Sequence, residues 1–167
     1  MSRLFRRILV PHDFSPQATQ ALRVAADLAA RAKGRLTVVH AIPNVYPIAG
    51  LPPVAPIGWY PPPVAPAELI ASVRRRLEAL VARAVSGRGR PRVACRVLAG
   101  DPFQCIMDAS RGASAIVMST LGRTGLPHLV LGSVAEKVVR HSPVPVLTIR
   151  ARASRKASAR PRGRRAS

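Results

Sequence analysis

A chain of 167 residues is long enough for one globular domain, and a hydrophobic fraction of 48% predicts a folded core. Aromatic residues make up only 4% of the chain, so the expected core is aliphatic. No apolar run reaches the ~18 residues of a membrane-spanning helix, and the N-terminus lacks the pattern of a signal peptide. These features predict no membrane insertion and a cytoplasmic location.

The formal net charge of +20 is extreme for this length. Residues 151–167 hold seven of the 27 basic residues and no acidic one, so 20 basic against seven acidic residues leave +13 on the rest. The composition of this tail predicts disorder. The positive electrostatic potential that this charge produces attracts nucleic acids, anionic membrane surfaces and nucleotides. An arginine-biased genome is the alternative explanation.

Apolar runs alternate with helical repeats along residues 1–150, which we interpret as one domain. Strands are expected at residues 7–11, 35–42, 93–98, 115–118 and 144–149. Helices are expected from Ser15–Pro16 to a stop at Gly34, over 67–85, from Asp101–Pro102 to Gly112, and over 134–141. In the second helix the expected apolar face consists of Leu69, Val73, Leu77, Leu80 and Ala84.

This order of elements predicts an α/β fold, a doubly wound five-stranded parallel sheet with helices on both faces. The first and fourth strands should flank the crevice in which such sheets bind ligands. Residues 43–66 interrupt the pattern with nine of the 17 prolines and are expected to form a loop insertion. The pair Trp59–Tyr60 in this loop could stack on a base or simply hold the loop down.

The cysteines Cys95 and Cys105 follow no metal-ligand spacing. We interpret them as reduced structural thiols, with a redox pair as the alternative. The sequence offers no catalytic triad, no paired carboxylates and no metal cluster that would support an enzyme mechanism.

The segment from Val117 to Glu136 is the most informative of the chain. A buried strand leads into a loop of glycines and small residues that ends at Gly132–Ser133, where a helix begins. A glycine loop before a helix N-terminus presents free N–H groups and a positive dipole end to an anion such as phosphate. The alternative is structural, because Ser133-x-x-Glu136 is also the spacing of a capping box.

The same segment resembles the universal stress protein family, whose nucleotide-binding members carry G-x2-G-x9-G-[S/T]. Gly122, Gly132 and Ser133 match this pattern, whereas Ser119 stands at its first glycine. The runs 8–15, Ile-Leu-Val-Pro-His-Asp-Phe-Ser, and 143–147, Pro-Val-Pro-Val-Leu, also read like family members. The resemblance spans roughly residues 5–150 and implies a Rossmann-like, adenine-nucleotide alpha-hydrolase-like fold.

The resemblance also implies a site for ATP, with Mg²⁺ carried by the nucleotide. It implies that Asp13 contacts the nucleoside, that the backbone near Ala41 touches the base, and that the glycine loop holds the phosphates. Arg123 could reach a phosphate, and Ser119 narrows the approach but can donate a hydrogen bond. The candidate binding residues are Pro11, His12, Asp13, Ala41, Ser119, Gly122, Arg123, Gly132, Ser133 and Val134.

The leading hypothesis is a cytoplasmic stress-response protein that binds ATP as a regulatory signal, with at most weak hydrolysis. The resemblance implies a homodimer formed through the last strand, Val144 to Ile149. A second hypothesis is a family member that binds no nucleotide, because Ser119 blocks the site, and acts through protein contacts of the proline loop. A third is binding of nucleic acid or anionic surfaces through residues 151–167.

Overall fold

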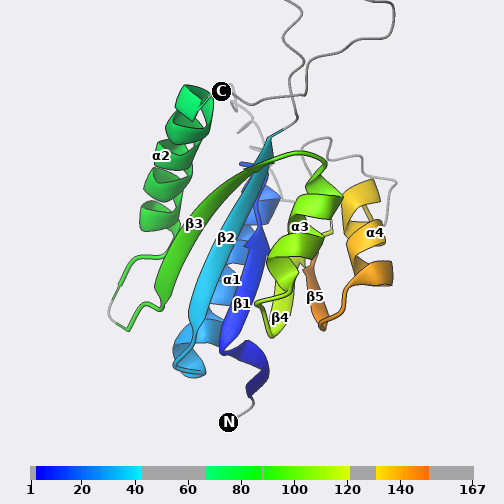
Figure 1. Ribbon diagram of the computed structural model, residues 1–167. Helices are drawn as coiled ribbons and strands as arrows, with labels where there is room; N and C mark the ends of the chain where they lie inside the picture. Colours follow the sequence, from blue (N-terminus) through cyan, green and yellow to red (C-terminus); the bar gives the residue numbers. More distant parts are fainter. Residues whose placement is uncertain (1–2, 43–66, 88, 121–130, 151–167) are drawn as a thin grey trace, which may run out of the picture.

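The computed structural model describes residues 3–42, 67–87, 89–120 and 131–150 (Figure 1). Five strands form one sheet in the order β3-β2-β1-β4-β5, and every neighbouring pair is parallel. This arrangement confirms the predicted doubly wound fold. The strands are β1 (Arg7–Pro11), β2 (Arg35–Ile42), β3 (Arg92–Ala99), β4 (Ala115–Ser119) and β5 (Val146–Ile149).

Within the described ranges four α-helices cover the two faces of the sheet, two on each (Figure 1). They are α1 (Pro16–Arg31), α2 (Ala67–Ala84), α3 (Pro102–Ser110) and α4 (Ser133–His141), preceded by a 3₁₀ turn, η1 (Arg3–Phe5). Helices α1 and α2 share one apolar cluster with the sheet, and α3 and α4 share the other. The chain changes direction between β1 and β4, so the switch point of the sheet lies between these strands.

Strand β1 is buried on both faces, as its apolar sequence predicts. Ile8 and Val10 belong to the cluster under α1 and α2, whereas Leu9 belongs to the cluster under α3 and α4. Successive side chains of a strand point to opposite faces, so three consecutive apolar residues serve both layers. The central strand therefore positions the residues that follow it, 12–15, at the carboxyl edge of the sheet.

Two helix starts follow the predicted cap-and-proline pattern. The Ser15 hydroxyl accepts a hydrogen bond from the Ala18 N–H (3.0 Å), and an Asp101 carboxylate oxygen accepts one from the Gln104 N–H (3.0 Å). In both helices a proline follows the cap, where its missing N–H costs nothing.

The predicted stop of α1 at Gly34 is wrong in its mechanism. The helix ends at Arg31, and Lys33, not Gly34, takes the left-handed conformation (φ 50°). The Gly34 N–H then donates to the Ala29 carbonyl (2.8 Å), which closes the helix end. Glycine is required at position 34 for another reason: a Cβ there would lie 2.5 Å from the Phe5 carbonyl oxygen.

We expect opposite stability changes at these two neighbouring positions. Lys33→Gly should stabilise the fold by about 0.5 kcal/mol, because glycine relieves the left-handed backbone but adds freedom to the unfolded chain. Gly34→Ala should destabilise it by about 1–3 kcal/mol, because the clash is with backbone that cannot rotate away. Urea unfolding of the two variants measures both changes, and equal stability of Gly34→Ala and the parent would contradict this packing.

The expected apolar face of α2 is correct only in its C-terminal half. Leu77 and Val81 are buried, whereas Leu69 is 39% exposed and the N-terminal half has no buried residue. The buried positions join the cluster that includes one face of β3, so helical periodicity alone overestimated the length of the contact. The last strand is also shorter than expected: it begins at Val146, after Pro143 and Pro145, which lack the N–H of a strand ladder.

Candidate functional site

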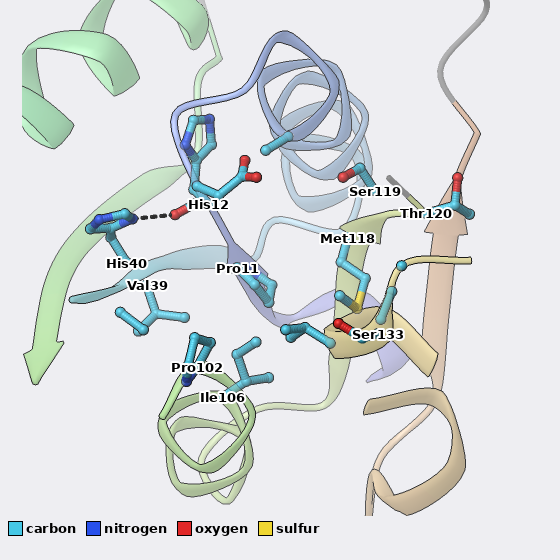
Figure 2. Close-up of a pocket in the computed structure, with 16 residues that line it drawn as sticks. Pro11, His12, Val39, His40, Pro102, Ile106, Met118, Ser119, Thr120 and Ser133 are labelled. Atoms are coloured by element: carbon cyan, nitrogen blue, oxygen red, sulfur yellow. Dashed lines mark hydrogen bonds between the residues drawn. The ribbon is translucent and has the colours of Figure 1, made fainter. Parts of the chain in front are cut away.

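A cavity of about 440 Å³ opens at the carboxyl ends of β1, β2 and β4 (Figure 2). It lies at the switch point, where doubly wound sheets bind ligands, and its volume is within the usual range of small-molecule sites, about 300–1,000 Å³. Figure 2 shows Val39, Pro102 and Ile106 on one side of Pro11, and Met118, Ser119 and Ser133 on the other.

The structure brings together eight of the ten candidate residues predicted from the sequence. Those that line the cavity are Pro11, His12, Asp13, Ala41, Ser119, Gly132, Ser133 and Val134. Gly122 and Arg123 lie outside the described residues. The remaining lining residues were not predicted: Ala18, Val39, His40, Pro102, Ile106, Met118, Thr120 and Ala135. Most of these are apolar or small, and their residue types carry no chemical signal in the sequence.

Backbone donors at the N-terminus of α4, beside the cavity, have no acceptor among the described residues. Gly132 is the N-cap, and no side chain caps the helix. The first amide bonded within the helix is that of Glu136, which donates to the Gly132 carbonyl (2.8 Å). The amides of Ser133, Val134 and Ala135 therefore have no acceptor within the helix, and all three residues line the cavity.

The capping box expected from Ser133 and Glu136 is absent. Ser133 is the first helical residue rather than the cap, because Gly132 occupies the cap position one residue earlier. The Glu136 carboxylate instead pairs with Arg140 at 3.0 Å, one turn further along the helix. The capping-box alternative is thus wrong, and no side chain of the described residues satisfies the first amides of α4.

Two backbone hydrogen bonds fix this helix terminus against the sheet. The Gly132 N–H donates to the Thr120 carbonyl (2.7 Å), and the Thr120 N–H donates to the Ile149 carbonyl at the end of β5 (3.1 Å). Thr120 and Gly132 are therefore held together. The anchoring keeps the amides of α4 at the end of β4, directly beside Ser119.

Asp13 has a structural role in addition to its place in the cavity. One carboxylate oxygen accepts a hydrogen bond from the Ser15 N–H (3.0 Å), which forms the turn into α1. This turn lies directly before the helix cap, which is Ser15. Its second oxygen has no partner among the described residues, and Asp13 carries the only formal charge in the described lining of the cavity.

His12 is buried, with 3% of its surface exposed, and it is held as a neutral ring. Its Nδ1 accepts from the Phe14 N–H (3.0 Å), so the proton lies on Nε2, which donates to the Thr19 hydroxyl (3.2 Å). That hydroxyl donates in turn to the Ser15 carbonyl (3.0 Å). Burial lowers the pKa of His12 to about 4, with Asp13 acting against this shift and His40 adding to it.

The network around His12 continues to one border of the cavity. His40 Nδ1 donates to the His12 carbonyl (2.7 Å), and the Phe14 ring meets the His40 ring edge-on at 4.6 Å between centroids. Phe14 takes a left-handed conformation (φ 66°), and the Arg76 guanidinium lies 4.6 Å from the centre of its ring. This network immobilises the turn after β1, which includes Asp13.

The cysteines do not form the redox pair considered above. Cys95 of β3 packs into the cluster under α1 and α2, whereas Cys105 lies in α3 on the opposite face, and both are free. Burial raises the pKa of both thiols, assisted by Glu78 at Cys95 and by Asp101 at Cys105. Both thiols are therefore poor nucleophiles at neutral pH.

The described lining of the cavity combines apolar walls with backbone hydrogen-bond donors. Val39, Ile106 and Met118 provide apolar walls that suit a flat ring, and the free amides of α4 suit an anion. Among the described residues, no group of three His, Cys, Asp or Glu side chains is placed to hold a metal ion. The helices within the described ranges include none with the length and apolarity needed to span a membrane.

Comparison with known proteins shows the relatives of this chain. A sequence model of the universal stress protein family matches residues 4–150. A universal stress protein of Thermus aquaticus, located in the QAH/OAS sulfhydrylase 3′ region, is 34% identical over 149 residues, 88% of this chain and 100% of its own length.

Solved structures share the fold. A universal stress protein family member of Burkholderia pseudomallei is 30% identical, with a TM-score of 0.60 over 90% of this chain and 100% of its own. The Archaeoglobus fulgidus universal stress protein in complex with dAMP is 22% identical, with a TM-score of 0.57 over 87% of this chain and 98% of its own. This chain belongs to the universal stress protein family.

Proposed function

We propose that the protein binds ATP in the cavity at the carboxyl ends of β1, β2 and β4. The single observation that carries this proposal is the uncapped N-terminus of α4, whose three free amides line the cavity. The phosphates bind these amides and the Ser133 hydroxyl. The base lies against Val39 and Ile106, near the backbone of Ala41, and the second carboxylate oxygen of Asp13 accepts from a ribose hydroxyl.

Two kinds of observation support a nucleotide. The Archaeoglobus fulgidus relative was solved with dAMP, and a further universal stress protein, 20% identical to this chain, was solved with cAMP. Both ligands combine an adenine base with a phosphate, the two chemical groups that the walls and the amides suit. The triphosphate is inferred from the resemblance of the glycine loop to the nucleotide-binding pattern. In this proposal Mg²⁺ arrives with the nucleotide, and Gly122 and Arg123 contribute from the loop.

The proposed role is a cytoplasmic, nucleotide-dependent regulator of a stress response that works as a homodimer. Strand β5 supports the dimer, because it is an edge of the sheet and exposes Leu147 (39%). Sedimentation of the chain over a range of concentrations tests the dimer. A single monomeric species at all concentrations would contradict it.

Calorimetric titration of the full chain with ATP and Mg²⁺ tests the site. We expect saturable binding of one ATP per chain, whereas inorganic tripolyphosphate, which lacks a base, should bind far more weakly. Multiple weak sites that do not distinguish ATP from tripolyphosphate would show that general electrostatics, not the cavity, accounts for binding. If ATP gives no heat and a Ser119→Gly variant gains binding, the chain is a member whose site is blocked by Ser119.

A further inference from the structure

A row of arginines crosses the sheet at the edge opposite the cavity, where the strands begin. In the strand register Arg7 of β1 is paired with Arg35 of β2, which is paired with Arg92 of β3. Neighbouring strands are about 4.8 Å apart, so three like charges lie side by side. Like charges in such positions repel one another and destabilise a sheet. The stability of the fold therefore does not explain this row.

A fourth arginine extends the row along β3 on the same face. Alternate residues of a strand share a face, and Leu98 belongs to the cluster under α3 and α4. Arg92, Ala94 and Arg96 therefore point to the α3 side of the sheet, and all three are exposed. Arg7 and Arg35 lie on this side too, because Leu9 and Val39 belong to the same cluster. In Figure 1 no described helix covers β3 on this side.

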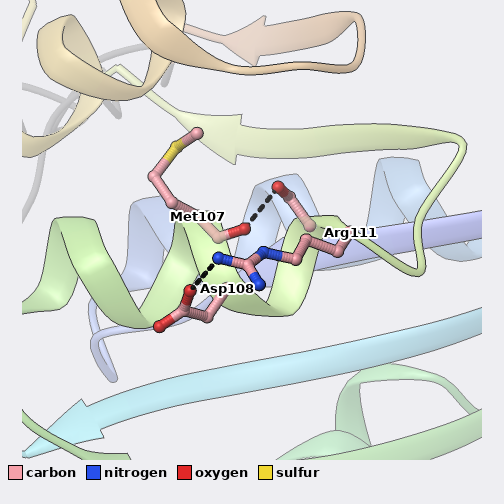
Figure 3. Close-up of polar contacts among 4 residues, drawn as sticks. Met107, Asp108 and Arg111 are labelled. Carbon is pink, nitrogen blue, oxygen red and sulfur yellow. Dashed lines mark hydrogen bonds and ion pairs between the residues drawn. The ribbon is translucent and has the colours of Figure 1, made fainter.

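None of the four guanidinium groups is neutralised within the described residues. The three ion pairs there lie within helices, Arg74–Glu78 in α2, Asp108 with Arg111 at the end of α3, and Glu136–Arg140 in α4. The Asp108 carboxylate pairs through one oxygen with the Arg111 guanidinium, 3.1 Å away (Figure 3). The residues of β1, β2 and β3 on this face include no acidic side chain.

We propose that this arginine face, consisting of Arg7, Arg35, Arg92 and Arg96, binds the phosphate backbone of duplex nucleic acid without reading its sequence. Guanidinium groups match phosphate oxygens bidentately and keep their charge at any physiological pH. The face carries no aromatic residue on which unpaired bases could stack, which favours a duplex over a single strand. Peripheral membrane helices insert apolar anchors, and the large hydrophobic residues exposed among the described ones, Leu69, Val139 and Leu147, lie on other elements than this face.

The test compares two triple variants of the full chain that remove the same charge. The strand variant is Arg35→Thr, Arg92→Thr and Arg96→Thr, and the helix variant is Arg31→Gln, Arg75→Gln and Arg83→Gln. Fluorescence anisotropy with a mixed-sequence DNA duplex gives the affinity at several salt concentrations. Each lost phosphate contact lowers the salt slope by about 0.9, so the strand variant should lose about 2.7. Between about 50 and 200 mM salt the parent should therefore lose about 40-fold more affinity than the strand variant.

The helix variant should keep the parent slope to within about one contact. Equal losses in the two variants would show that only net charge matters, and unchanged slopes in both would show that this face makes no contact; either result overturns the proposal.

Vesicles of phosphatidylcholine and phosphatidylserine serve as the second probe. If the strand variant loses vesicle binding but keeps duplex binding, the face is a membrane surface and the proposal is wrong. The strand variant should melt no lower than the parent, because it relieves repulsion between neighbouring strands.

Discussion

A Gly132→Asp variant should bind ATP about 100-fold more weakly than the parent while keeping its fold. Gly132 has the extended conformation of an N-cap (φ −71°, ψ 153°), which aspartate adopts without strain. Its carboxylate would accept from the free amides of the first turn of α4 and would repel a phosphate. Losing one or two charge-assisted hydrogen bonds, at about 1.5–3 kcal/mol each, corresponds to a change of this size.

The Gly132→Asp variant should bind ATP more weakly and yet be slightly more stable than the parent. A side-chain cap stabilises a helix by a few tenths of a kcal/mol relative to glycine, so lost ATP binding could not be ascribed to unfolding. The matched control is Gly112→Asp, because a Cβ at Gly112 meets nothing within 4 Å and Gly112 does not line the cavity. It adds the same charge and should leave ATP affinity within about twofold. Calorimetry measures both variants; parent-like affinity of Gly132→Asp would place the phosphates away from α4.

The strands were predictable from sequence because a sheet buried on both faces demands consecutive apolar residues. Ile8, Leu9 and Val10 show this directly, since they divide between the two clusters of the core. The starts of α1 and α3 were equally readable, because Ser15–Pro16 and Asp101–Pro102 carry their caps in the local sequence. The end of α1 was not, because glycine at position 34 is imposed by the approach of Phe5, a contact that local spacing does not encode.

The candidate site was likewise predictable from the sequence only in part. Asp13, Gly132 and Ser133 could be selected in advance, because parallel strands bring their carboxyl ends to one edge and the glycine loop signals a helix N-terminus. The apolar wall of the cavity could not be selected in advance, because Ile106 reaches the cavity from α3 only where that helix packs over β2 and β1. The capping box failed because a one-residue difference in the helix start decides whether Ser133 satisfies the helix or faces the cavity.

The second large effect is a loss of stability in mild acid caused by His12. Its pKa is about 4 in the folded protein, against about 6.5 for an unburied histidine. Between these values the unfolded chain binds a proton at His12 that the folded protein does not. Unfolding therefore becomes easier as the pH falls from 6.5 to 4, and the contribution of His12 to this loss levels off below pH 4. The difference in pKa corresponds to about 3 kcal/mol.

The variant His12→Asn isolates this contribution. An asparagine oxygen can accept from the Phe14 N–H as Nδ1 does, so the turn is kept, although the link from Nε2 to Thr19 is lost. The variant should be less stable than the parent at neutral pH, by about 1 kcal/mol for the lost hydrogen bond.

Urea unfolding of both proteins at several pH values between about 4 and 7 gives the comparison. All other residues are the same in the two proteins, so their contributions largely cancel in the difference. The two stability curves should converge and then cross as the pH falls, because only the parent must keep a buried imidazole neutral against its own affinity for protons. Parallel curves would mean that the folded protein protonates His12 as readily as the unfolded chain does, which its burial and its two hydrogen bonds as a neutral ring oppose.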